Sequence, residues 1–506
     1  TYGDVMVNIN KTFGDDWSLN ANIGASINNI KTDELSYRGP IQENGLPNVF
    51  NVFDLDDTKK RAEKTGWHDQ TQSLFASVEV GWKQMLYLTV TGRNDWASQL
   101  ANSPSSSFFY PSVGLSWVPT STWDLGEALS YLKIRGSIAS VGMPFPRHLT
   151  IPTYEYDATN RVWKDKTHYP IGDLKPERTT TYEVGLDARL WQRISLSASW
   201  YQADTKNQTF DPSLPPSSSY TTIYLQTGHV RNTGVELSAG YDNQWRDFRW
   251  ATNFTYSWNR NEIIELAANA VNPVTGEPLN LNKLDIKGLG KAKYILKEGG
   301  TLGDLYTTSD LRFNDNGYIE VDKNGNLLLT DEGDDIYLGS VFPDHNLAWR
   351  NDFSWKGINL GVLFTARIGG ICYSATQANM DLYGVSEASA AARDAGGVWI
   401  NGRELVDAQK WYQAIGSQSG LPQYYTYSAT NIRLQELSLG YTLPAKWFRD
   451  KMRMTVSFVG RNLWMIYCKA PFDPEAVAST GLNYQGIDYF MMPSLRSLGF
   501  NVKFQF

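Results

Sequence analysis

Strict alternation of apolar and polar side chains constrains this 506-residue chain more than any other feature of its sequence. From residue 182 to residue 190 every even-numbered position is apolar or aromatic, whereas Glu183, Asp187 and Arg189 occupy odd-numbered positions. Because successive side chains of a β-strand point to opposite faces, this period predicts strands with one apolar and one polar face. Convincing helical periodicity is almost absent, so we expect an all-β fold.

Two kinds of antiparallel sheet fit this alternation. A soluble sheet packs its apolar face on a core, whereas a transmembrane barrel turns that face to lipid and its polar face to the lumen. Three features favour the barrel: short and long connections alternate, aromatic residues gather at strand ends, and the chain finishes on an alternating strand typical of barrels. The strand-end aromatics are Trp82, Trp96, Trp117, Trp191, Trp250, Trp355, Trp447, Phe448 and Trp464. Leu498 begins the apolar positions of the last strand, and the four that follow, which we assign to barrel assembly, are Phe500, Val502, Phe504 and Phe506.

About fifteen strands can be placed on the sequence. They lie near residues 2–12, 17–27, 68–80, 85–96, 108–118, 131–141, 178–191, 193–205, 229–241, 247–262, 345–355, 358–370, 429–443, 451–465 and 493–506. Bacterial single-chain barrels have an even number of strands, and a bilayer does not tolerate an open sheet with two unpaired edges. We therefore expect residues 1–506 to be the C-terminal part of a larger transmembrane antiparallel barrel, completed by another chain or by another part of the protein.

One strand breaks the regular alternation. Ile432 and Leu434 share a face, but the apolar series resumes at Leu437 and Leu439, one residue out of phase. This shift predicts a β-bulge near Gln435–Glu436.

Short motifs in the predicted strands carry a resemblance to a known family. They include Arg93-Asn94-Asp95-Trp96, Phe109-Tyr110-Pro111-Ser112, Leu174-Lys175-Pro176-Glu177-Arg178, Asn232-Thr233-Gly234-Val235-Glu236-Leu237, Leu439-Gly440-Tyr441-Thr442-Leu443-Pro444 and Gly460-Arg461-Asn462-Leu463. Together they resemble the SusC/RagA family of TonB-dependent outer-membrane transporters, over essentially the whole chain. The resemblance implies a 22-stranded barrel in the bacterial outer membrane, of which this chain would supply strands 8 to 22, without the plug or the TonB box.

The resemblance also implies a function and a set of partners. The function is active import of an oligomeric nutrient, a glycan or a peptide, energised through TonB, with no bond made or broken. The implied partners are a SusD-like surface lipoprotein, the TonB complex, the remaining barrel strands and plug, outer-membrane lipid, and a second transporter–lipoprotein pair in a dimer. A passive porin and a soluble β-rich carbohydrate-active enzyme are the alternatives.

Charge and residue spacing argue against other functions. The formal net charge is −7 and there is no dense basic block, so we expect no nucleic-acid partner. The five histidines are scattered without metal or nucleophile–base spacing, so we expect neither an enzyme nor a cofactor. No apolar run reaches 18 residues, so no membrane-spanning helix is expected.

Five long segments, 142–177, 206–228, 264–344, 371–428 and 466–492, are expected to be extracellular loops. Their aromatic side chains have flat faces and polar edges that suit sugars or peptide side chains, although packing between loops or against a lipoprotein is the alternative for each. The candidate substrate contacts are Trp163, Tyr169, Tyr220, Tyr224, Tyr306, Trp399, Trp411, Tyr412, Tyr424 and Tyr425.

Two further loop features are weaker. Oxygen ligands for Ca²⁺ could come from Asp322, Asn324, Asn326 and Asp331, but the spacing departs from the full calcium-loop pattern, and a solvated acidic loop is the alternative. Cys372 and Cys468 both follow strands that end on the extracellular side, which leaves a disulfide between them open.

Overall fold

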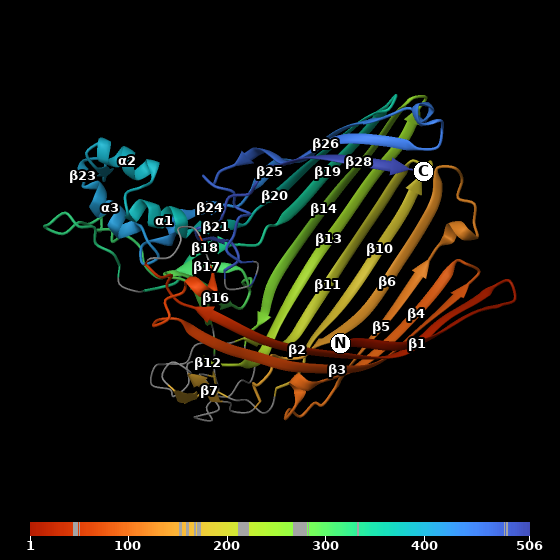
Figure 1. Ribbon diagram of the computed structural model, residues 1–506, viewed down its shortest axis with the longest axis horizontal. Coiled ribbons are helices and arrows are strands. Elements are labelled where there is room, and N and C mark those ends of the chain that lie inside the picture. Colours follow the sequence, from red (N-terminus) through yellow and green to blue (C-terminus); the bar gives the residue numbers. More distant parts are fainter. Residues whose placement is uncertain are drawn as a thin grey trace.

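Fifteen strands of the computed structural model form one continuous antiparallel sheet in chain order (Figure 1). They are β1 (Tyr2–Phe13), β2 (Trp17–Arg38), β3 (Arg61–Trp82), β4 (Leu86–Ala97), β5 (Phe108–Trp117), β6 (Leu129–Met143), β10 (Glu177–Leu190), β11 (Ile194–Phe210), β13 (Leu225–Trp245), β14 (Phe248–Glu265), β19 (His345–Trp355), β20 (Ile358–Ile368), β25 (Asn431–Thr442), β26 (Arg453–Cys468) and β28 (Ser497–Gln505). The structure describes residues 1–43, 49, 51–150, 154–157, 161–165, 168–169, 174–210, 222–266, 281, 283–330, 333–479, 481 and 484–505. The all-β prediction and its fifteen strands are confirmed.

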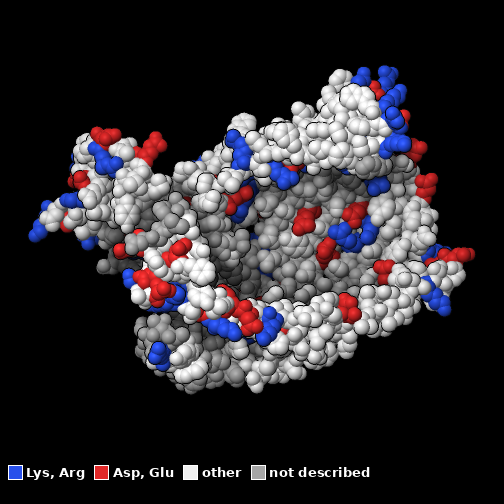
Figure 2. Space-filling view, in the orientation of Figure 1, with Lys and Arg blue, Asp and Glu red and all other residues white. Residues whose placement is uncertain are grey.

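The sheet is curled and remains open along one side (Figure 1), and it surrounds the hollow that the space-filling view shows (Figure 2). Its two edges are β1, which pairs only with β2, and β28, which pairs only with β26. Every described residue of both edge strands is exposed. Each edge therefore presents a row of backbone groups with no neighbouring strand among the described residues.

The two faces of the sheet differ as the alternation predicts. On β10 the outward residues Tyr182, Val184 and Leu186 are 43%, 56% and 39% exposed, whereas the inward residues Glu183 and Asp187 form ion pairs. Figure 2 shows acidic and basic side chains on the wall of the hollow. Apolar groups thus cover the convex face, where a soluble sheet would expose polar ones.

One end of the sheet carries short turns and a belt of aromatic rings. Trp17 lies 6.4 Å from Trp82 between ring centroids, and Trp250 stacks on Phe353 at 6.2 Å. Lysines of the turns lie over neighbouring rings, as Lys83 does over Trp82, with 5.2 Å between its amino nitrogen and the ring centroid. Amphipathic rings with cations beside them suit the boundary between lipid and water, so this end fits the predicted aromatic girdle.

Several strands run well past the predicted ten residues. β2 and β3 each contain 22 residues and pair along their full length, from Trp17 opposite Trp82 to Arg38 opposite Arg61. Strand pairing continues beyond the apolar band because the ladder needs only backbone groups, whereas the sequence pattern detects only the apolar positions. The prediction therefore ended β2 too early, at residue 27, and began β3 too late, at residue 68.

The predicted bulge is confirmed at Gln435. Leu363 pairs with Glu436 and Phe364 with Leu434, so Gln435 is the extra residue of β25. The register also shifts against β26, but there the extra residue belongs to β26, since Leu434 pairs with Trp464 and Glu436 pairs with Arg461. Leu434 and Leu437 consequently share the outward face despite their odd separation.

Three long loops fold together into a separate layer at the other end of the sheet (Figure 1). Its strands and helices are β15 (Lys283–Leu289), β16 (Ala292–Lys297), β17 (Asp304–Thr307), β18 (Ile336–Ser340), β21 (Ile371–Ser374), α1 (Ala375–Leu382), α2 (Glu387–Asp394), β22 (Val398–Ile400), β23 (Glu404–Val406), α3 (Ala408–Ile415), β24 (Thr426–Ser428) and β27 (Ile487–Asp488). We call the described residues of these three loops, 264–344, 371–428 and 466–492, the loop layer. Its core joins Leu305, Tyr373, Ile415 and Ile487, which come from three different loops.

The helices of the loop layer were not predicted. Each of the three contains only eight residues and is fixed by a capping side chain: Ser374, Ser386 and Asp407 accept hydrogen bonds from the first turns. Helices this short depend on tertiary contacts, and eight residues make only about two turns, which is too short to establish a helical period in the sequence. No helix among the described residues has the length and hydropathy needed to cross a membrane.

Small elements complete the described structure. They are the strands β7 (Tyr154–Asp157), β8 (Val162–Asp165), β9 (His168–Tyr169) and β12 (Thr222–Ile223), and the 3-10 helices at Val52–Asp54, Ser98–Leu100, Pro119–Ser121, Pro422–Tyr425 and Ala445–Phe448.

Candidate functional site

The concave wall of the sheet carries clusters of paired charges. Arg135 of β6 donates to Glu183 at 3.1 Å and to Asp187 at 2.8 Å, both on the neighbouring strand β10. Asp187 also accepts a hydrogen bond from Ser197 at 2.7 Å. Gly185 allows this arrangement, since a Cβ there would meet the Arg135 guanidinium at 2.7 Å.

Two similar clusters lie elsewhere on the wall. Asp95 accepts from Arg93 at 2.7 Å and from the Tyr110 hydroxyl at 2.6 Å. Beside the bulge, Glu436 accepts from Arg350 at 3.2 Å and from Arg461 at 3.0 Å. The bulge turns Glu436 to the concave face, so that it lies between two arginines of other strands. These clusters give the wall polar groups of both signs, although the sequence motifs alone did not indicate which charges would pair.

Arg433 joins the wall to the loop layer. Its guanidinium contacts both oxygens of Asp473, at 3.2 and 3.0 Å, and Glu475 at 3.3 Å. The Arg433 side chain is only 5% exposed. Burial opposes ionisation of Asp473. Hydrogen bonds from Arg433, from Ser494 and from the backbone of Glu475 nevertheless hold the pKa of that carboxyl below its usual value.

The structure places four of the candidate aromatic contacts together in the loop layer. Trp411 and Tyr424 meet edge to face with 6.0 Å between ring centroids. Tyr412 and Trp411 pack on the edge of the layer's core, while Tyr425 is buried at 2% exposure. Of these four, Tyr425 packs within the layer as a structural side chain, because almost none of its surface reaches solvent.

Tyr306 has a similar structural position. It is 8% exposed, with Lys297 over its ring at 4.6 Å and Tyr337 beside it at 5.2 Å. Burial raises the pKa of Tyr306 and raises that of Tyr337 to about 12. Packing between loop elements, the alternative stated for each aromatic, thus accounts for Tyr306.

The other candidate aromatics do not converge on one site. Trp163 and Trp399 are 69% and 65% exposed, and Tyr224 packs against a small cluster that contains Phe145 and Leu174. The backbone of Tyr169 pairs with β12. Tyr220 lies outside the described residues. Substrate contact therefore stays a prediction for the exposed rings.

The calcium prediction also stays untested. The Asp322 carboxylate accepts hydrogen bonds from the backbone of Asn324 and Asn326 and from the Asn326 side chain, at 2.8–2.9 Å. These bonds hold the pKa of Asp322 below its usual value. Asp331 lies outside the described residues, and no group of three His, Cys, Asp or Glu side chains able to hold a metal occurs in the described part.

The two cysteines carry free thiols. Cys372 is buried in β21, and burial raises the pKa of its thiol to about 12. Cys468 ends β26, where its thiol donates to the carbonyls of Ala470 and Phe472. Both lie at the loop-layer end of the sheet, as expected.

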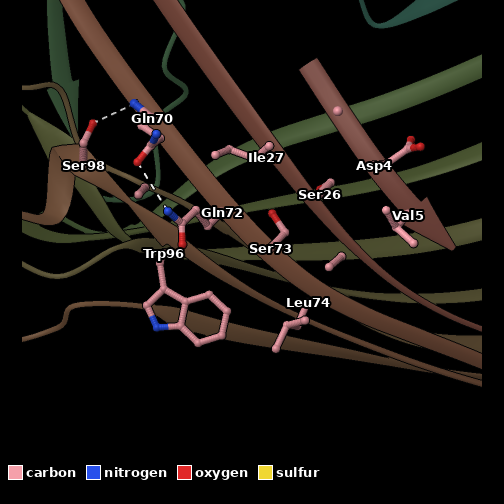
Figure 3. Close-up of a pocket in the computed structure, with 13 residues that line it drawn as sticks. Asp4, Val5, Ser26, Ile27, Gln70, Gln72, Ser73, Leu74, Trp96 and Ser98 are labelled. Carbon is pink, nitrogen blue, oxygen red and sulfur yellow. Dashed lines mark hydrogen bonds between the residues drawn. The ribbon is translucent and has the colours of Figure 1, made fainter. Parts of the chain in front are cut away.

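A concavity of about 1080 Å³ lies on the convex face near the β1 edge (Figure 3). Small residues such as Gly3 and Ala25 leave room there beside Leu74 and Trp96. Hydrogen bonds join Gln72 to Gln70, and the Gln70 backbone to Ser98. The described residues of its lining include no cation, and it opens on the apolar face, so it is no part of the polar wall.

A curled antiparallel sheet with apolar groups outside, paired charges inside and long loops at one end is the wall of an outer-membrane β-barrel. The family model described as TonB dependent receptor-like, beta-barrel matches residues 1–363. The chain therefore belongs to the TonB-dependent receptor family, which confirms the predicted outer-membrane location.

Similar proteins support this assignment. TonB-dependent receptor P3 of Formosa agariphila is 24% identical over 523 residues, covering 95% of this chain and 49% of that protein. TonB-dependent receptor SusC of Bacteroides thetaiotaomicron is 21% identical over 347 residues, covering 66% of this chain and 32% of SusC. The RagAB peptide importer in its open-open state matches with a TM-score of 0.73 at 18% identity, over 99% of this chain and 54% of that chain. The resemblance to SusC/RagA proteins is thus confirmed. The match spans about half the length of receptor P3 and of the RagAB chain, and about a third of SusC.

Proposed function

We propose that this chain forms most of the wall of a transporter that actively imports an oligomeric nutrient across the outer membrane. The observation that carries the proposal is the polar concave wall, where Arg135, Arg93 and Glu436 each stand in a cluster of paired charges. A lumen lined in this way lets a hydrated solute pass while apolar groups face lipid.

The rest of the transporter would complete this wall. The two edges, β1 and β28, have no outer neighbour among the strands that the structure describes, and a bilayer does not tolerate such open edges. We infer that about seven further strands, a plug and a TonB box come from the part that the chain does not cover, which gives a 22-stranded barrel. A lumen of that width needs a plug, and its displacement through TonB makes import active.

The proposed substrates are peptides or glycans. Oppositely charged groups close together on the wall suit oligomers with many polar groups, such as the charged ends and side chains of peptides or the hydroxyls of glycans. RagAB is a peptide importer, and the likeness of this chain to its structure supports the peptide alternative only through the shared fold.

A SusD-like lipoprotein is the proposed partner over the loop layer, in a dimer of transporter–lipoprotein pairs. Tyr383, Val385 and Trp399 are 76%, 69% and 65% exposed on the loop layer, although they are apolar or aromatic. Exposed apolar side chains on a folded layer suit contact with a second protein. Triple substitution of these three residues by Ser should reduce recovery of the lipoprotein with the transporter, while the transporter itself still assembles.

Uptake by cells tests the proposal. Cells with the full transporter should accumulate a labelled oligopeptide or oligosaccharide, and deletion of TonB should abolish accumulation of the substrate class that is used. A passive porin would be insensitive to TonB, so unchanged uptake after its deletion would overturn active import.

A further inference from the structure

A second concavity on the convex face differs from the apolar one near β1. It measures about 700 Å³ and lies across β5, β6, β10, β11 and β13. Arg178, Lys206, His229 and Arg231 line it, together with one carboxylate, Asp204. The part of this concavity nearer the short-turn end of the sheet is apolar. It includes Val113, Ile138 and Tyr182, which are 46%, 54% and 43% exposed.

This concavity forms because β5 and β6 separate there. Their pairing ends at Ser112 opposite Ala139, and the next residue of β5, Pro111, has no N–H to continue it. Arg178 of β10 reaches across the gap, donating to the Phe109 carbonyl at 3.0 Å and to the Ser140 hydroxyl at 2.9 Å. A cation is thus held where the sheet opens.

The single carboxylate of the concavity is already paired. Asp204 accepts from Arg231 at 2.8 Å and from Gln202 at 2.9 Å, and it lies 2.8 Å from the His229 ring nitrogen. Lys206 has no ion pair within 4 Å among the described residues, and Arg178 bonds only neutral groups. The concavity therefore has a surplus of positive charge.

The distance of these positive charges from the short-turn end of the sheet indicates where they lie in the membrane. Leu190 lies at the short-turn end of β10, and Arg178 lies twelve residues away along the same strand. In a strand tilted as in barrels, twelve residues place Arg178 about 30 Å above Leu190 along the barrel axis. This height is just above an apolar band about 25 Å tall. The cations therefore stand at the level of the outer-leaflet head groups, directly above apolar side chains at the level of acyl chains.

We propose that this concavity binds the phosphate-bearing head group of an outer-leaflet lipid. Arg178 and Lys206 contact the phosphate, while the acyl chains lie along Ile138, Val113 and Tyr182. Arginine and lysine are the side chains that bind phosphate, and cations near a membrane surface favour anionic lipids. The apolar concavity near β1 has the same outward orientation but no cation, so it offers no such contact.

Native mass spectrometry of the full transporter, extracted from outer membranes into detergent, tests the proposal. Phosphatidic acid and diacylglycerol with the same acyl chains are titrated separately, and inorganic phosphate is added as a competitor. The wild-type transporter should retain phosphatidic acid but not diacylglycerol. Arg178→Gln with Lys206→Gln should weaken retention about thirtyfold, as expected for two cations at a membrane surface.

Matched variants separate binding from folding. Lys133→Gln with Arg189→Gln removes the same charge from the polar face of β6 and β10, and should leave retention unchanged. Lys206→Gln alone leaves the two hydrogen bonds of Arg178 intact and should still weaken retention, so loss of those bonds cannot explain the result. Equal retention of diacylglycerol, equal retention by the double variant and its control, or displacement by millimolar inorganic phosphate would each overturn the lipid site.

Discussion

The barrel wall and the loop layer place the same residue types in opposite positions. On the wall Leu186 is 39% exposed and Val184 is 56% exposed, while in the loop layer Leu305 and Tyr373 are fully buried. The wall has paired charges on its inner face, whereas the loop layer has an apolar interior. The difference shows that the surrounding solvent, lipid or water, decides which side of a sheet is apolar, and that one chain can follow both rules.

The largest expected effect concerns the link between the two regions. Arg433→Ala should release the loop layer from the wall, because it removes the buried cation that holds Asp473, whose side chain is 12% exposed, at a cost of about 3–5 kcal/mol. Limited proteolysis should then cut within residues 466–492. Arg461→Ala removes a 66% exposed arginine from the wall and should change protection little. Equal protection in both variants would mean that Arg433 does not hold the two regions together.

The same truncation should have different consequences in the two regions. Leu305→Ala leaves a cavity in the core of the loop layer and should cost about 2–5 kcal/mol. Leu186→Ala on the wall should cost less than about 1 kcal/mol, since lipid fills the space. Hydrogen exchange of the loop layer and urea unfolding of the barrel in liposomes measure the two costs. Similar costs at both positions would contradict the contrast between lipid and core.

A charge on the wall should be tolerated on one face only. Leu186→Arg places a cation in the lipid and should impair assembly by about 2–4 kcal/mol. Ser238→Arg places it on the concave face, beside an open space of about 370 Å³, and should assemble normally. The fraction of heat-modifiable protein reports assembly. If both variants assembled equally, the assignment of faces would be wrong.

The smallest effect is a pH dependence confined to the loop layer. The Asp335 side chain is 7% exposed and contacts Lys297 at 2.9 Å and Lys283 at 3.0 Å. Burial opposes its charge, but these hydrogen bonds hold the pKa of Asp335 below its usual value. A depressed pKa stabilises the fold above the unfolded-state pKa, so about 1 kcal/mol of local stability should be lost as pH falls below about 4. Asp335→Asn should remove this pH dependence from the hydrogen exchange of β15 and β16, whereas Asp285→Asn, at an exposed carboxylate nearby, should retain it.

The sequence predicted the wall better than the loop layer for a physical reason. Alternation at residues 182–190 is set by lipid on one side, and the bulge at Gln435 left a visible phase shift. In the loop layer, Leu305 and Ile487 belong to one apolar cluster although they are far apart in the sequence, and no local period records that packing. For the same reason Tyr425 looked like a surface aromatic, and the partners of Arg135 could be named only once the register of β6 against β10 was known.

The shared core of the loop layer bears on how such transporters diversify. Because Leu305, Tyr373 and Ile487 belong to three loops and pack together, a change of volume in one loop needs compensating changes in the other two. Insertions at turns such as those of Gly317 and Gly325, which have positive φ and lie outside this core, carry no such requirement. Recognition by this face of the molecule should therefore evolve either by exchange of all three loops as a block or by variation restricted to the turn tips.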